Sequence, residues 1–231
     1  FVDADWRLFA GLFKDTDGFM ARNVERPISL RIARRLASTG ITPNQITSLS
    51  VGIGLCGALF FLSANWLWQT VGALLFLAHS ILDGCDGELA RLRFQESRFG
   101  GIIDYWGDNV VHIVVFACMA IGWSLSIGAS WPLLLGVAAA LGNLGSAWFV
   151  YWRVMHTKKD SGPLFTSVAT VPGHTLARML DAASRRDFIY LVLFLALFGK
   201  SNWFLVLAAT GAPILFLLLL FPAVRERFQT A

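Results

Sequence analysis

Four aspartates with the chemistry of metal ligands lie in one short stretch of this sequence: Asp83, Asp86, Asp104 and Asp108. The first two are three residues apart and the last two are four apart, so each pair occupies one face of a helix. If the two helices form a hairpin, the pairs face one another, and a divalent cation would relieve the repulsion among the carboxylates. All-oxygen ligands favour hard cations such as Mg²⁺, Mn²⁺ or Ca²⁺ over zinc.

The residues around the aspartates indicate what the site binds. Gly87 and Gly100, with the small Ala90, would let a bulky ligand approach the backbone closely. Arg91 offers a planar set of donors to a phosphate group. Because Mg²⁺ sites often combine a few carboxylates with substrate phosphates, the set indicates phosphoryl or pyrophosphate chemistry.

The aspartates are bordered by two apolar runs, residues 36–82 and 109–152, that contain no Asp, Glu, Lys or Arg. Carboxylates between such runs are costly unless they bind something, so they mark a functional site. Their spacing alone leaves a second interpretation open. It is a carboxylate network inside an ion-coupled membrane transporter.

Composition places the aspartates in a membrane protein. The chain is 56% hydrophobic and 15% charged, against roughly 25% charged residues in soluble domains. The net charge of +4 is carried by short basic clusters between the apolar runs. Lipid headgroups or anionic substrates are therefore the expected partners, and nucleic acid is not.

The pattern predicts an all-α, polytopic membrane protein with six transmembrane helices, preceded by an interfacial amphipathic helix. We divide the chain into an N-terminal juxtamembrane part, 1–40, and a membrane domain, 41–231. Thr42-Pro43-Asn44 is typical of a helix start. The predicted spans are 43–64, 67–91, 99–123, 131–155, 187–200 and 202–223. Glycines of the first and fourth spans are expected to permit close helix packing: Gly52, Gly54, Gly57, Gly136, Gly142 and Gly145.

Basic residues predict the orientation of these spans. They concentrate in the N-terminal region, in alternate connections and at the C-terminus. Both termini and the aspartates are therefore expected on the cytoplasmic side of the inner or plasma membrane. Residues 17–35 are predicted to form two short helices separated at Pro27, the second amphipathic. The connection 157–184 is long enough to indicate a functional or mobile segment.

The motif Asp83-x2-Asp86-Gly87-x2-Ala90-Arg91-x8-Gly100-x3-Asp104-x3-Asp108 resembles the signature of the CDP-alcohol phosphotransferase (CDP-alcohol phosphatidyltransferase) family at every fixed position. The resemblance covers about residues 17–225. It implies a transferase that cleaves a CDP-linked donor, moves the phosphoalcohol to an acceptor hydroxyl and releases CMP.

The resemblance also implies roles for individual residues. Asp83, Asp86 and Asp104 would bind two Mg²⁺ or Mn²⁺ ions, and Asp108 would bind metal or act as the catalytic base. The CDP-binding set would be Asn44, Thr47, Asp83, Gly87, Ala90, Arg91 and Gly100. His112, one turn beyond Asp108, has two interpretations: it orients that aspartate, or it is satisfied by another neighbour.

Residues 14–29 look similar to the di-myo-inositol-phosphate phosphate synthase branch of the family. This likeness implies CDP-inositol as donor, an inositol phosphate as acceptor and a fused or partner cytidylyltransferase domain, which a chain beginning at Phe1 would fit. Homodimers are expected from the family. Phosphatidyl transfer from CDP-diacylglycerol is the alternative reaction. Basic residues expected to bind the acceptor phosphate, or only to set topology, are Arg153, Lys158, Lys159, Arg178, Arg185 and Arg186.

Overall fold

The structure, a computed structural model, describes residues 19–152 and 187–229, with side chains described up to residue 220. The described residues form helices and contain no strand, which confirms the predicted all-α class. The elements are η1 (Ala21–Glu25, a π-helical segment), α2 (Arg26–Ala37), α3 (Pro43–Phe60), α4 (Trp66–Leu92), α5 (Arg98–Ile127), α6 (Trp131–Val150), α8 (Phe188–Leu197) and α9 (Ser201–Gln229).

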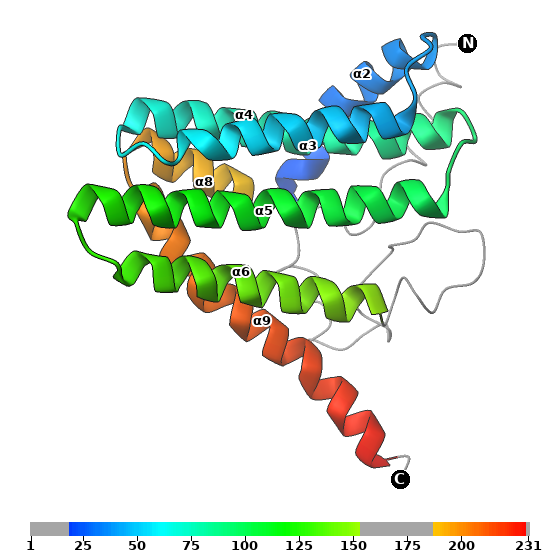
Figure 1. Cartoon of the computed structure of the whole chain (residues 1–231). Coiled ribbons are helices and arrows are strands. Elements are labelled where there is room, and N and C mark those ends of the chain that lie inside the picture. Colours follow the sequence, from blue (N-terminus) through cyan, green and yellow to red (C-terminus); the bar gives the residue numbers. More distant parts are fainter. Residues whose placement is uncertain (1–18, 153–186, 230–231) are drawn as a thin grey trace.

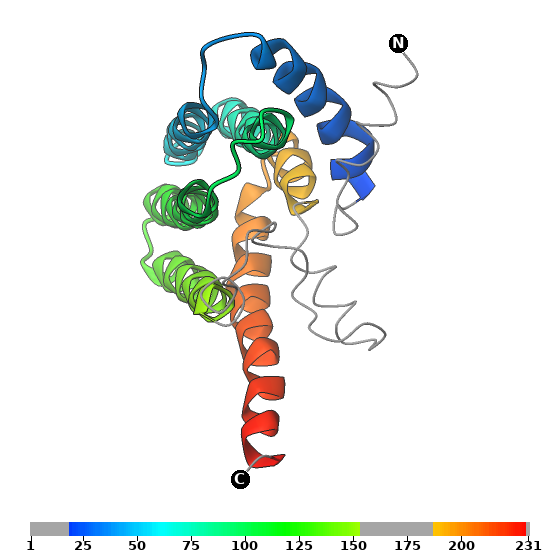
Figure 2. The ribbon, with the colours of Figure 1, turned by 90° about the vertical axis from the view of Figure 1, so that its right-hand side faces the viewer.

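Helices α3, α4, α5 and α6 run back and forth beside one another, and α9 crosses α6 obliquely (Figure 1). Helix α8 packs on α4. Helix α2 packs on α4 as well, but lies across the bundle: it appears lengthwise in the view that shows α3 to α6 end-on (Figure 2). We call the end at which α4 finishes and α5 begins the site end of the bundle.

The predicted spans coincide with observed helices, with boundaries that differ by a few residues; the predicted 153–155 lie outside the described residues. By length and hydropathy, α5, α6 and Ser201–Leu220 of α9 are suited to cross a membrane. Helix α8 is apolar and has ten described residues. Helices α3 and α4 fall outside this set; α3 begins with polar residues and α4 carries the charged motif.

The sequence around each helix start explains where the site helices begin. Helix α3 starts with a capping box, in which the Gln45 amide donates to the Thr42 hydroxyl at 3.4 Å and the Thr42 amide donates to Gln45 Oε1 at 2.9 Å. The predicted start at Thr42 is thus confirmed. Helix α5 starts after Ser97, whose hydroxyl accepts from the Gly100 amide at 3.0 Å. These caps satisfy amides that have no partner inside the helix.

Glycines let the helices approach closely. A Cβ on Gly57 would lie 2.8 Å from Leu75 Cβ and 3.0 Å from the Gly72 carbonyl oxygen, so α3 and α4 meet almost backbone to backbone. Tight surroundings confirm the packing prediction for five glycines: Gly54, Gly57, Gly136, Gly142 and Gly145. The prediction is wrong for Gly52, which faces open space because it lies on the outer side of α3.

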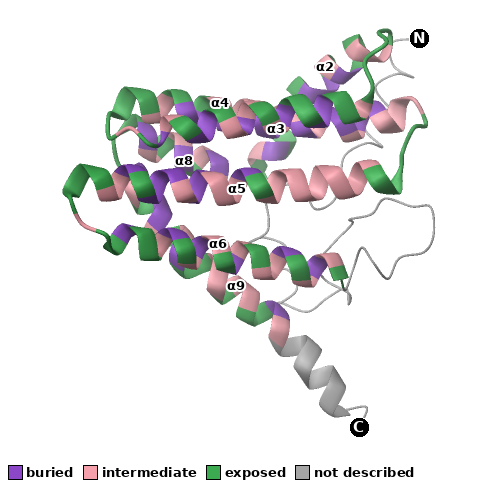
Figure 3. Ribbon diagram, viewed as in Figure 1, coloured by how far each residue is buried: buried purple, intermediate pink, exposed green. Residues whose placement is uncertain are grey.

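The buried core joins α3, α4, α5, α6, α8 and α9, as the purple segments of Figure 3 show. Phe76, Val111 and Val115 are among its buried members. The predicted separation of two helices at Pro27 is wrong, because the π-helical η1 passes directly into α2 at Arg26 without an intervening turn. Proline is tolerated there because it occupies the first turn of α2. Residues 1–18 lie outside the described part.

Candidate active site

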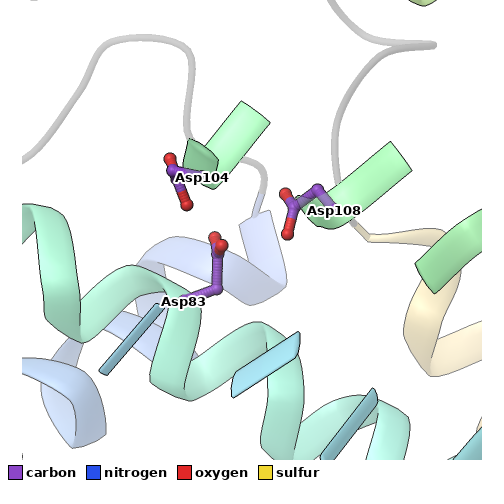
Figure 4. A group of neighbouring side chains, drawn as sticks. All are labelled: Asp83, Asp104 and Asp108. Carbon is purple, nitrogen blue, oxygen red and sulfur yellow. The ribbon is translucent and has the colours of Figure 1, made fainter. Parts of the chain in front are cut away.

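Helices α4 and α5 bring three of the four aspartates together at the site end. Asp83 comes from the second half of α4, and Asp104 and Asp108 come from the first turns of α5. One carboxylate oxygen from each lies within 4.8 Å of the other two. Figure 4 shows the three carboxylates pointing toward one another between the helices. The carboxylates of the two helices therefore face one another, as expected from the sequence, while α3 packs against both helices; together they make a compact all-oxygen site.

Asp86 lies outside this group of three and is bonded to α3. It is buried, and its Oδ2 atom accepts a hydrogen bond from the Thr47 hydroxyl. Thr47 occupies the second turn of α3, so the capped start of that helix places its hydroxyl against α4. A hydrogen bond to a carboxylate in a buried setting fixes the orientation of that carboxylate.

The electrostatics of the group fit a divalent cation. The carboxylates of Asp83, Asp86 and Asp108 all repel a negative charge on Asp104. Among the described residues, Asp104 Oδ1 is buried without a hydrogen-bond partner. A buried carboxylate oxygen that lacks a donor, surrounded by other carboxylates, needs a cation to remain charged. Oxygen ligands of this kind suit Mg²⁺ or Mn²⁺.

The two glycines expected around the CDP group lie near the aspartates, but they differ in how much open space lies beside them. A Cβ on Gly100 would lie 3.0 Å from Asn44 Oδ1 and from Ser97 Oγ, so the space beside this glycine holds protein side chains. The nearest atoms to a Cβ on Gly87 belong to the flexible Arg91 guanidinium, at 3.6 Å. Of these two glycines, Gly87 therefore leaves more room for a ligand beside the backbone.

A histidine that sequence reasoning did not single out lies at the site. His79 Nε2 is 3.4 Å from Asp108 Oδ1, and His79 Nδ1 is 2.9 Å from the Ser50 carbonyl oxygen. Because a carbonyl only accepts, Nδ1 carries a proton and Nε2 faces the aspartate. The signal in the sequence was its position four residues before Asp83, one turn earlier on the same face.

His112, one turn beyond Asp108, packs against aromatic rings. Its ring lies 5.6 Å from that of Phe76 and 5.4 Å from that of Phe188, both nearly edge-on. The six basic residues expected to bind the acceptor phosphate, at positions 153, 158, 159, 178, 185 and 186, lie outside the described residues. The same holds for the long connection 157–184.

The fold and the aspartate group together define a class of helical, apolar protein with an all-oxygen site between two helices. Residues 40–199 match the CDP-alcohol phosphatidyltransferase family. The chain belongs to this family, and the resemblance noted in the sequence is confirmed.

Individual relatives are similar over about half of this chain. The bifunctional IPC transferase and DIPP synthase of Aquifex aeolicus is 34% identical over 125 residues, which are 54% of this chain and 27% of that protein. The protein of the same name from Rubrobacter xylanophilus is 40% identical over 122 residues, 52% of this chain and 27% of that protein. The matched part thus spans about a quarter of these relatives.

Archaetidylinositol phosphate synthase of Pyrococcus horikoshii is 32% identical over 113 residues, 49% of this chain and 58% of that protein. Among solved structures, the phosphatidylinositol phosphate synthase of Mycobacterium tuberculosis with CDP-DAG bound shares the fold. Its TM-score is 0.53 at 21% identity, covering 83% of this chain and 92% of that chain. The same enzyme in complex with manganese and citrate gives 0.53 at 20% identity, covering 84% and 88%.

Proposed function

We propose that this protein transfers a phosphoalcohol group from a CDP-alcohol to an acceptor hydroxyl, with release of CMP and with dependence on a divalent metal ion. The observation that carries the proposal is the convergence of Asp83, Asp104 and Asp108 within 4.8 Å in a chain of this family. Family membership favours this reaction over the ion-coupled transporter that the carboxylates alone left open.

The metal site would be formed by Asp83, Asp86, Asp104 and Asp108, holding two Mg²⁺ or Mn²⁺ ions. A bound divalent ion would neutralise the pyrophosphate and stabilise the charge that develops on the leaving CMP. The buried, undonated oxygen of Asp104 supports this assignment. So does manganese in one structural relative. Asp86 would also position the metal site, since Thr47 holds its carboxylate in place.

The CDP moiety would lie along α4, where Gly87 and Ala90 leave room beside the backbone and Arg91 binds phosphate. Asp83 would contact the donor through the metal site. Two residues of the first turns of α3, Asn44 and Thr47, would border the pocket; Asn44 lies beside Gly100 of α5. These residues would orient the donor so that the acceptor oxygen lies in line with the bond to CMP.

Asp108 would act as the catalytic base. It would take the proton of the acceptor hydroxyl while that oxygen bonds to the phosphorus of the phosphoalcohol and the bond from this phosphorus to CMP breaks. Its position next to His79 Nε2 supports a role in holding a proton. The proton would then leave with solvent.

For the substrates, we propose CDP-inositol as donor and an inositol phosphate as acceptor. Relatives named IPC transferase and DIPP synthase, at 34% to 40% identity, support this choice. A cytidylyltransferase, fused or separate, would supply the donor, as the bifunctional names of those relatives suggest. The basic residues at positions 153, 158, 159, 178, 185 and 186 would bind the acceptor phosphate.

A second reaction, phosphatidyl transfer from CDP-diacylglycerol to inositol phosphate or glycerol phosphate, is favoured by a separate observation. Relatives named archaetidylinositol phosphate synthase and phosphatidylinositol phosphate synthase match half of the chain. The fold is also shared with an enzyme whose structure contains CDP-DAG. The two reactions share the metal site and the leaving group and differ in the group attached to CDP.

We propose six spans in the inner or plasma membrane, formed by α3, α4, α5, α6, α8 and α9 within residues 41–231, and a homodimeric assembly. The site end would face the cytoplasm together with both termini, and α2, within residues 1–40, would lie in the membrane interface. Exposed arginines on α2 support this position, because cationic side chains bind lipid headgroups.

The test is CMP release by the purified protein in detergent with Mg²⁺ or Mn²⁺. CDP-inositol, CDP-diacylglycerol, CDP-choline and CDP-glycerol would each be paired with inositol, inositol phosphate, glycerol phosphate and diacylglycerol. We expect metal-dependent CMP from CDP-inositol with inositol phosphate, and none from Asp83→Asn. CMP from CDP-diacylglycerol alone would establish the lipid reaction instead. No CMP from any pair by folded protein would contradict the proposed activity.

A further inference from the structure

Helix α4 has a second polar face, next to the one that carries the aspartates. Ser80, Gly84 and Glu88 recur on it at four-residue intervals. Ser80 Oγ donates to Glu25 Oε2 at 3.0 Å, and a Cβ on Gly84 would lie 3.5 Å from Ser29 Cβ. This face is therefore covered by η1 and α2.

Glu88 is the centre of that contact. It is fully buried, and its Oε1 atom accepts hydrogen bonds from Arg26 Nη1 and from Ser29 Oγ, both at 2.8 Å. The Arg26 side chain is 12% exposed, so the ion pair is shielded from solvent. Charge-assisted hydrogen bonds in such a setting are short and strong, and removing one partner leaves a buried charge. The family signature leaves position 88 variable, and its partner comes from α2.

The other end of α2 is held by Arg93, the residue that follows α4. Its guanidinium donates to the carbonyl oxygens of Leu36 at 2.6 Å and Ala37 at 3.1 Å. It also donates to the carbonyl oxygens of Thr39 and, at 2.6 Å, Ile41. The last carbonyls of a helix have no partner within it, and a cation there is favourable.

Apolar contacts fill the space between these two attachments. Buried Cys85 and Leu89 of α4 form a cluster that is packed by Ile32 and Leu36 of α2. The stretch from Cys85 of α4 to Arg93, which follows it, is thus bonded and packed along the length of α2. It contains Asp86, the proposed metal ligand held by Thr47, and the Arg91 of the CDP site.

We propose that Arg26, Glu88 and Arg93 form a clamp that positions the last turns of α4, so that α2 is part of the site's framework as well as an interfacial helix. These are positioning residues that act through Asp83, Asp86 and Arg91. The physical reason is that the last turn of a helix frays easily, and Asp86 lies only six residues before the end of α4 at Leu92. This inference rests on the proposed metal-dependent function.

The test compares Arg26→Gln with Arg31→Gln, which removes an exposed arginine from the same helix. We expect Arg26→Gln to raise the metal concentration that gives half-maximal CMP release, by less than the roughly 10- to 100-fold that removing a direct partner of a metal ligand costs, because Arg26 contacts Glu88 and not a ligand. Hydrogen exchange of residues 85–92 should rise as well, and Arg31→Gln should leave both quantities unchanged. Assays would be run well below the unfolding midpoint of each variant.

Two more variants keep the test independent of folding. Ser29→Ala leaves the ion pair intact and should raise the half-saturating metal concentration only a few-fold. Adding Glu88→Gln to Arg26→Gln removes the uncompensated charge. The rise in the half-saturating metal concentration of the double variant should therefore be smaller than the combined rises of the two single variants. Unchanged exchange in residues 85–92 and wild-type metal dependence in Arg26→Gln would overturn the clamp, even if its unfolding midpoint falls.

Different results would contradict the proposed clamp and the proposed function. If the wild-type protein released no CMP with any metal, the proposed function would be lost. The exchange of residues 85–92 in Arg26→Gln, compared with Arg31→Gln, would still decide whether α2 holds the end of α4: increased exchange supports the clamp and unchanged exchange overturns it.

Discussion

The Nε2 atom of His79 lies 3.4 Å from the Oδ1 atom of Asp108, so α4 contacts the proposed base on α5 as well as supplying Asp83 to the site. The ring is oriented from its other side, where Nδ1 donates to the Ser50 carbonyl oxygen of α3 at 2.9 Å. One histidine thus connects three helices at the reacting end of the site, which suggests a test of each nitrogen in turn.

We expect His79→Asn to lower turnover more than His79→Gln. The asparagine amide replaces Nδ1 and its bond to Ser50 but does not reach Asp108, whereas the glutamine amide reaches the position of Nε2. Loss of an outer partner costs roughly 10- to 100-fold in activity, so the asparagine variant should fall in that range. Turnover would be measured as CMP release at saturating donor. Equal losses in both variants would show that the Asp108 contact has no role.

Asp108→Asn should abolish turnover while largely preserving donor binding. A general base contributes roughly 100- to 10,000-fold to rate, and the amide has no basic oxygen for the acceptor proton. CMP release in a single turnover would measure the chemical step, and equilibrium binding of the CDP donor would measure the ground state. Turnover near that of the wild type would remove Asp108 from the role of base.

Asp83→Asn should weaken metal and donor binding together, because the Asp83 carboxylate belongs to the three-aspartate group. Removing even an outer partner of a ligand costs roughly 10- to 100-fold, and we expect a ligand to cost at least as much. Manganese binding, followed by electron paramagnetic resonance without substrate, would measure this directly. Asp187→Asn, at the start of α8, is the matched control because its carboxylate accepts from the Ala21 amide and not from the site. Wild-type affinity in Asp83→Asn would contradict the metal assignment.

Thr47→Val should destabilise the site by removing the hydroxyl that donates to the buried Asp86 carboxylate. Hydrogen bonds to charged groups contribute about 1.5–3 kcal/mol. We expect a loss of this order in the free energy of unfolding in detergent, together with weaker donor binding. The control is Ser48→Ala, one residue along, because the Ser48 side chain is exposed and its hydroxyl donates to the Asn44 carbonyl oxygen within α3. Equal effects from the two variants would argue against a special role for the Thr47–Asp86 bond.

Gly57→Ala and Gly52→Ala should have opposite effects on stability, although both lie in α3. The Gly57 Cβ would meet Leu75 and Gly72 at 2.8–3.0 Å, and overpacking costs about 1–3 kcal/mol. Among the described residues, no atom lies within 4 Å of a Cβ on Gly52, where alanine gains up to about 1 kcal/mol of helix propensity. Thermal unfolding in detergent would measure both. A stable Gly57→Ala protein would show that α3 and α4 separate without cost.

Local patterns in the sequence were sufficient for the helices and for the chemistry of the site. The apolar runs and the capping signal at Thr42 predicted where α3 begins, because both act within a few neighbouring residues. The signature from Asp83 to Asp108 likewise predicted an all-oxygen site, since its spacing puts the carboxylates on helix faces.

Which residues meet across helices was decided only by the tertiary structure. Glu88 occupies a variable position of the signature, and nothing near it in the sequence indicates that Arg26 is its partner. His79 and His112 have similar spacing to the aspartates, yet His79 lies beside Asp108 and the His112 ring packs against phenylalanines. The reason is physical: periodicity determines the face of a helix on which a side chain lies, but its neighbour depends on how helices distant in sequence cross and pack.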